Sequence, residues 1–133
     1  MKTQQAIAIS AAVAAFALAA TSAQADQSAT SSDGAWKASS SLAGSLAVKS
    51  HAQATVKITP AAGGAACPQV ANVLFEMPSH GHGGDVDPKS AAAGTCEWKI
   101  TDLAPSMGGE WRLRLVVKDG GKSSNIDFMV QAK

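Results

Sequence analysis

The chain has 133 residues, of which 46% are apolar and 16% charged, and its formal net charge is +1. This balance is too apolar for a disordered chain and lacks the surplus of basic residues typical of a nucleic-acid-binding protein, so no nucleic-acid partner is expected. Outside the extreme N-terminus, no stretch is long and apolar enough to predict a transmembrane helix.

The N-terminus has the pattern of a cleaved signal peptide. Lys2 supplies a positive charge, an alanine-rich apolar run follows, and the small-residue sequence Ala23-Gln24-Ala25 matches a signal-peptidase site. We therefore expect residues 1–25 to be removed and the remaining chain to be periplasmic or secreted. That remaining chain carries ten basic and ten acidic side chains, so it has no net charge.

Both cysteines, Cys67 and Cys96, lie in the exported part. Exported compartments are oxidising, so we expect a disulfide between them. A pair of thiolate metal ligands is the weaker alternative, because neither cysteine has a second one close by in the sequence. A disulfide requires Cα atoms within about 7 Å. The connection 78–94 must then cross between sheets and return the chain to the end where it started.

Most of the chain beyond residue 40 has the pattern of short strands. Apolar and polar residues alternate in segments 53–59, 95–103, 110–118 and 124–131, and segment 70–77 is nearly continuously apolar. The apolar positions that share a face within each segment are Ala54, Val56 and Ile58; Val73, Phe75 and Met77; Cys96, Trp98 and Ile100; Trp111, Leu113, Leu115 and Val117; and Ile126, Phe128 and Val130.

Turn residues and composition complete the fold prediction. Asp119-Gly120-Gly121 predicts a tight hairpin turn between the last two segments, and the run 36–50 is expected to hold one or two further strands. Six to seven strands without a convincing helix predict an all-β fold, a β-sandwich with a Greek-key arch. We expect residues 26–40 to form a flexible leader and residues 41–133 a single domain.

The long connection after the second strand segment holds the residues best suited to chemistry. His80 and His82 are two positions apart, and such residues point the same way in an extended backbone, so both imidazoles can face one ion. Met77 ends the preceding strand, and Met107 stands in a second Gly-rich loop. Both loops flank strands of one small sandwich and can meet at one end.

Two imidazoles and two thioethers favour copper. Thioether sulfur is soft and selects Cu(I), whereas imidazole suits both copper oxidation states. Zinc is the second choice, with Asp85 and Asp87 joining His80 and His82 in a harder site. We rank it second because four such ligands in a flexible Gly-rich loop are not preorganised. The structural alternative is that the histidines are polar loop residues and Met77 fills the core.

Other polar and aromatic residues have structural interpretations. His51 is expected in a solvated turn. Trp98 and Trp111 are expected in the core, with Trp111 close enough to the second methionine loop to line a site. Arg112 and Arg114 are expected on a solvated face that is able to contact a partner.

Three segments carry a resemblance to a known family. They are Met77-Pro78-Ser79-His80-Gly81-His82-Gly83, residues 94–103, and Met107-Gly108-Gly109-Glu110-Trp111. Together they resemble the YtkA-like domain, which is related to the periplasmic part of FixH-type proteins, over about residues 46–130. The resemblance implies an immunoglobulin-like sandwich and copper handling outside the cytoplasm, with Met77, His80, His82 and Met107 at the matching positions. The Cys67–Cys96 pair is a local addition, and Trp98 replaces the more usual tyrosine.

The sequence favours an exported copper chaperone or buffer that delivers metal to a cuproenzyme or to a copper transporter at the inner membrane. The alternative is a secreted interaction module with no metal role. We expect no enzymatic activity, because the chain has no recognisable nucleophile elbow, phosphate-binding loop or pair of catalytic carboxylates.

Overall fold

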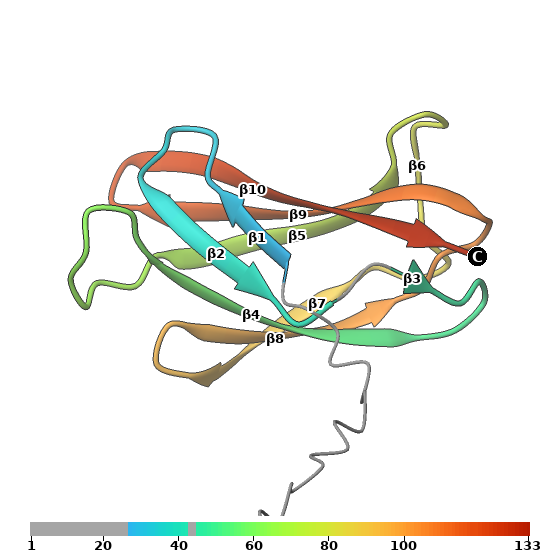
Figure 1. Ribbon diagram of the computed structural model, residues 1–133, viewed down its shortest axis with the longest axis horizontal. Helices are drawn as coiled ribbons and strands as arrows, with labels where there is room; N and C mark the ends of the chain where they lie inside the picture. Colours follow the sequence, from blue (N-terminus) through green and yellow to red (C-terminus); the bar gives the residue numbers. More distant parts are fainter. Residues whose placement is uncertain (1–26, 43–44) are drawn as a thin grey trace, which may run out of the picture.

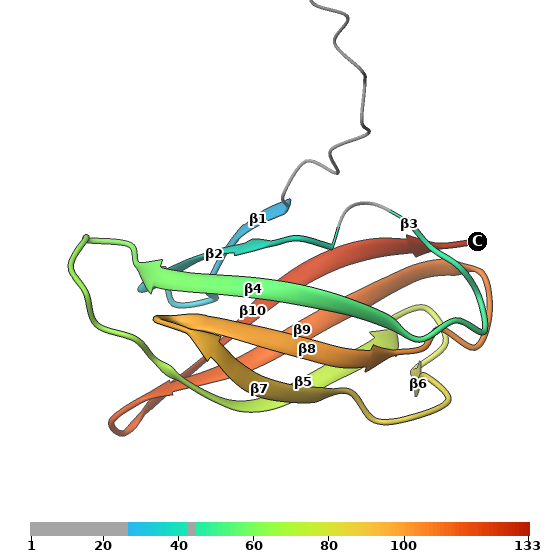
Figure 2. The same ribbon diagram turned by 90° about the horizontal axis from the view of Figure 1, so that it is seen from below.

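The computed structural model describes residues 27–42 and 45–133, which form two five-stranded sheets packed face to face (Figures 1 and 2). The all-β sandwich prediction is confirmed. Among the described residues, no helix is long and apolar enough to cross a membrane. The predicted signal peptide, residues 1–25, lies outside the described residues.

The strands pair antiparallel except β3 and β10, which run parallel. The first sheet has, in spatial order, β1 (Gln27–Thr30), β2 (Trp36–Ser40), β4 (Ala52–Pro60), β8 (Glu97–Leu103) and β7 (Lys89–Gly94). The second sheet has, in spatial order, β3 (Ser45–Leu46), β10 (Lys122–Ala132), β9 (Gly109–Asp119), β5 (Gln69–Met77) and β6 (His82–Gly83).

The core lies between the sheets and consists of the apolar faces that the alternation predicts. Val56, Ile58 and Ile100 of the first sheet are fully buried, as are Trp111 and Leu113 of the second. Period-two alternation sends successive side chains to opposite faces of a strand, so one face of each sheet is apolar and excludes water. Trp98 is only partly buried and packs at the margin of this core.

The predicted hairpin turn between the last two strands is confirmed. Asp119 and Lys122 face each other across β9 and β10, which leaves Gly120 and Gly121 as the two-residue turn. Gly120 has a φ of +60°, a backbone conformation that glycine adopts without steric cost. Together β9 and β10 form the long hairpin at the centre of the second sheet.

The number of strands exceeds the predicted six to seven, because the described residues form ten. The longest strand that the sequence did not predict is β7, whose six residues are all exposed. With no buried face, β7 has no apolar alternation to detect, and its backbone pairing with β8 holds it at the edge of the sheet. Segment 36–50 holds β2 and β3, as expected.

The flexible leader predicted over residues 26–40 is wrong for residues 27–40, which form β1, β2 and the turn between them. The side chains of Trp36, Ala38 and Ser40 are buried. The Ser31 hydroxyl accepts a hydrogen bond from the Trp36 amide at 2.9 Å, which closes the turn. Composition misleads here because small residues pair through their backbones, and the folded unit begins before residue 41.

The structure contains the expected Cys67–Cys96 disulfide, with a Cα–Cα distance of 5.1 Å. Cys67 precedes β5 in the second sheet, and Cys96 lies in the turn between β7 and β8 in the first. The expected crossover is confirmed. The chain leaves the second sheet after β6, and β7 carries it back to the end where Cys67 lies.

Candidate metal centre

The candidate ligands gather at the end of the sandwich opposite the disulfide. Figures 1 and 2 both place β6, the connection between β8 and β9, and the C-terminus at this end. The nine residues of β5 separate this end of the sandwich from the disulfide by roughly 30 Å, at about 3.4 Å per residue.

A tight turn presents the two histidines. The Met77 carbonyl accepts hydrogen bonds from the His80 amide at 3.1 Å and from the Gly81 amide at 2.8 Å. Gly81 has a φ of +67°, so the chain reverses and His82 pairs with Met77 across β5 and β6. The sequence argument assumed an extended backbone, and the turn replaces it.

The turn brings the imidazoles together nonetheless. The ring centroids of His80 and His82 are 5.7 Å apart. A histidine ring nitrogen binds an ion such as zinc at about 2 Å, so the ion lies about 3 Å from the ring centre. The centres of two imidazole rings that bind one ion therefore lie within about 6 Å of each other. The His82 Nδ1–H donates to the Gly83 carbonyl at 3.1 Å. This leaves the Nε2 lone pair free to bind a metal.

The Met107 backbone and the His82 ring contact the same aromatic side chain, that of Trp111. The Trp111 indole Nε1–H donates to the Met107 carbonyl at 3.0 Å. The His82 ring lies edge-on to the Trp111 ring at a centroid distance of 5.8 Å. Phe75 stacks on Trp111 at 5.0 Å. The two loops, which were expected from the sequence to be able to meet at one end, therefore converge on Trp111.

The two methionines differ in exposure. Met77 is 3% exposed and Met107 is 39% exposed. The Met77 methyl group occupies the space beside Gly109, where a Cβ atom would lie less than 3.0 Å from it. Met77 thus sits beneath the end of the loop that carries Met107 at its surface.

The zinc-like alternative does not assemble in the described part of the chain, where no three His, Cys, Asp or Glu side chains are grouped around a common point. Asp85 instead lies 3.6 Å from the Lys49 ammonium. Its backbone amide donates to the Ala104 carbonyl at 3.1 Å, which attaches the crossover to the second loop.

His51 is exposed in the segment between β3 and β4, as expected of a solvated residue, but it also has a partner that sequence reasoning missed. Its Nδ1 is 3.3 Å from Asp102 Oδ1, and the Lys89 ammonium is 3.5 Å from the other oxygen of Asp102. The hydrogen bond from His51, with the charge of Lys89, lowers the pKa of Asp102. The pair is 51 residues apart in sequence, so no local pattern could have indicated it.

Arg112 and Arg114 lie on the outer face of the second sheet, each beside an acidic side chain of a neighbouring strand. Arg112 is 3.3 Å from Glu76, and Arg114 makes two hydrogen bonds to Asp127 at 2.7 and 2.8 Å. These pairs balance the charge of the face.

The bond from Arg114 makes folding stability depend on pH at Asp127. It holds the pKa of Asp127 below the ordinary value of 3.8. A pKa that is lower in the folded state stabilises the fold above about pH 4, and this stabilisation is lost as the pH falls through the lowered value. Because the Asp127 side chain is 37% exposed, solvent screening limits the effect.

We expect Asp127→Asn to lower the free energy of unfolding by about 1 kcal/mol at pH 7. Urea unfolding should show this difference shrinking toward about pH 3, and a pH-independent difference would contradict the assignment.

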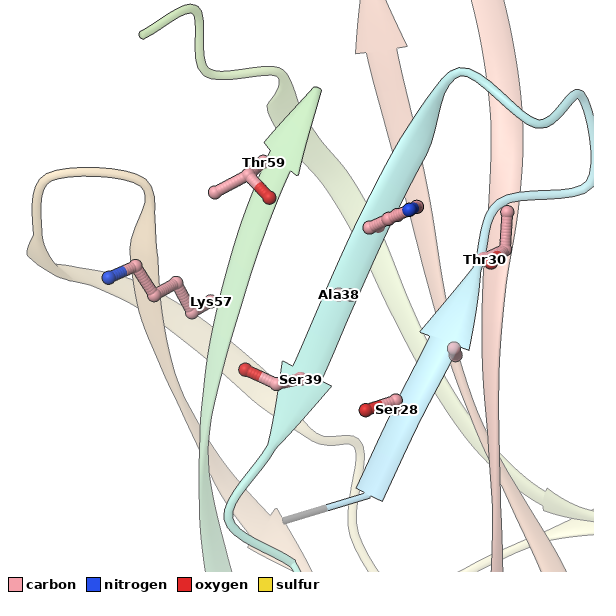
Figure 3. Close-up of a pocket in the computed structure, with 8 residues that line it drawn as sticks. Ser28, Thr30, Ala38, Ser39, Lys57 and Thr59 are labelled. Carbon is pink, nitrogen blue, oxygen red and sulfur yellow. The ribbon is translucent and has the colours of Figure 1, made fainter. Parts of the chain in front are cut away.

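The surface of the described part of the chain also carries grooves. A groove of about 680 Å³ lies on the outer face of β1, β2 and β4. Figure 3 shows its hydroxyl and lysine side chains, among them Ser28, Ser39 and Lys57. A second groove, of about 350 Å³, lies beside the candidate centre, between β5 and the crossover that carries Val86 and Pro88.

Comparisons with known proteins add no relative: no protein-family model, no curated protein and no solved structure matches this chain.

Proposed function

We propose that the protein is an exported copper-binding protein that carries Cu(I) as cargo at the end of the sandwich formed by the turn after β5 and the loop before β9. The observation that carries this proposal is the convergence of the two loops. The His80 and His82 rings lie 5.7 Å apart, and the loop of Met107 meets His82 on Trp111. Imidazole and thioether together form a donor set that favours Cu(I).

The exposure of the donors favours a carrier over a permanent metal site. His80 and Met107 are exposed, His82 is half-buried and Met77 is buried. A partner's ligand can approach from the exposed side and replace His80 and Met107 first. This supports a chaperone or buffer that passes copper to a cuproenzyme or to a transporter at the inner membrane.

The strand order supports the immunoglobulin-like form of the sandwich and, with it, the likeness to the YtkA-like family. The order β2-β4-β8-β7 in one sheet and β10-β9-β5 in the other corresponds to the ABED and GFC arrangement of immunoglobulin constant-type domains. Under this assignment β3 and β6 are short additions to the second sheet, and the crossover after β6 is the Greek-key connection.

Anaerobic titration of the purified protein with Cu(I) against a chromophoric chelator tests the proposal. We expect one equivalent of tightly held Cu(I). The Met77→Leu/Met107→Leu double variant should bind at least tenfold more weakly, since a tenfold loss corresponds to only about 1.4 kcal/mol. Leucine for methionine nearly conserves volume, so the fold should tolerate the change.

Met129→Leu is the matched control, because Met129 is 37% exposed, close to the exposure of Met107, but belongs to strand β10, opposite Arg112, and to neither loop. Its affinity should equal that of the wild type. Tight Zn(II) binding that ignores the methionines would move the site to His80 and His82 with other ligands. Failure to bind either metal would favour the interaction module.

A further inference from the structure

We infer that Trp111 is the positioning residue of the copper site, holding the histidine turn and the methionine loop in one arrangement before the metal arrives. This inference rests on the proposed function. Its basis is that one side chain contacts both loops: the indole N–H bonds the Met107 carbonyl, and the indole ring meets the His82 imidazole.

Trp111 is well suited to hold the two loops because its own side chain is tightly packed. Its side chain is fully buried, and Phe75 of the adjacent strand β5 stacks on its ring. Strand β9 fixes its backbone between β5 and β10, at the centre of the second sheet. The indole therefore projects a rigid donor and a rigid ring surface at the end of the sandwich.

The bond to Met107 is specific in its chemistry. An indole N–H only donates, and a buried donor without an acceptor costs about 1 to 3 kcal/mol. The Met107 carbonyl satisfies it at 3.0 Å, so the loop is drawn toward the indole although the Met107 side chain stays exposed. Departure of the loop would leave the donor unpaired.

The ring contact acts on the other loop. His82 is half-buried, and its ring lies at 70° to that of Trp111, an edge-to-face arrangement that aromatic rings favour. Together with the Nδ1–H bond to the Gly83 carbonyl, this contact fixes the direction in which the His82 Nε2 points. A ligand held in advance loses less entropy when the metal binds.

Trp111→Phe tests the inference, because phenylalanine keeps an aromatic ring beside Phe75 but removes the N–H. We expect the full-length variant to fold and to bind Cu(I) at least tenfold more weakly than the wild type. Trp98→Phe is the matched control, because it makes the same substitution on β8, in the other sheet. Its Cu(I) affinity should stay within about threefold of the wild type, since a substitution that leaves the orientation of the ligands intact has little effect on metal binding.

Nuclear magnetic resonance of the metal-free protein supplies a second readout. Trp111→Phe should shift the amide signals of both 80–83 and 106–108, whereas Trp98→Phe should leave both sets unchanged. Disturbance of one loop alone, or equal Cu(I) affinity in Trp111→Phe and a copper-binding wild type, would overturn the positioning role. A wild type that binds no Cu(I) would instead overturn the proposed function.

Discussion

Removal of the Cys67–Cys96 disulfide is expected to destabilise the fold by about 3 to 4 kcal/mol, the loop-closure value for the 29-residue separation. The bond joins the segment before β5 in one sheet to the turn between β7 and β8 in the other. Without it, the unfolded chain gains freedom and the edge strand β7 loses its covalent attachment to the second sheet.

Thermal unfolding of the Cys67→Ala/Cys96→Ala variant checks this expectation. For a domain of about 100 residues, the loss corresponds to a decrease in Tm of roughly 15 °C. Reduction of the wild type should give a similar decrease, and the double variant should not respond to reductant. A decrease of only one or two degrees would show that packing alone holds the sheets together at this end.

The second large effect is expected at Gly84, where the crossover touches the loop before β9. A Cβ atom added there would lie less than 3.0 Å from the backbone oxygen of Ala104. A backbone atom cannot yield as a flexible side chain can, so Gly84→Ala must displace one of the two segments. The Asp85 amide bond to the same carbonyl, at 3.1 Å, should weaken with it.

We expect Gly84→Ala to lower the free energy of unfolding by about 2 kcal/mol, a cost typical of overpacking. Gly83→Ala is the matched control: its added Cβ would meet the nearest atom, the Phe75 carbonyl oxygen, at 3.7 Å, an ordinary contact. Chemical denaturation of both variants should separate them by more than 1 kcal/mol. Equal stability would mean that the crossover moves aside without cost.

Local patterns predicted the central strands well because those strands bury one face. Within β4, β9 and β10 buried and more exposed residues alternate, and every buried position except Ser124 is apolar, so the alternation in the sequence is the direct result of their environment. Strands β1 and β7 show no such alternation of apolar and polar residues. Most of their residues are small and exposed, and backbone pairing with the neighbouring strands holds them in place.

The sequence likewise indicated some contacts of the candidate centre and not others. His80 and His82 stand in one short run, so a sequence pattern was enough to suggest that they act together, although a turn and not an extended segment joins them. The contact of Met77 with Gly109 and the hydrogen bond from His51 to Asp102 join residues at least 32 positions apart. Patterns of residue spacing in the sequence cannot predict contacts between residues so far apart.

The sequence by itself determined the all-β class, the inward faces of the long strands and the need for a crossover between the two cysteines, because alternation and covalent reach are properties of the chain alone. Only the tertiary structure decided which strands lie at the edges, how many there are and that Trp111 joins the two loops. These depend on which backbones pair and how the sheets stack, and pairing between distant segments leaves no periodic trace in either of them.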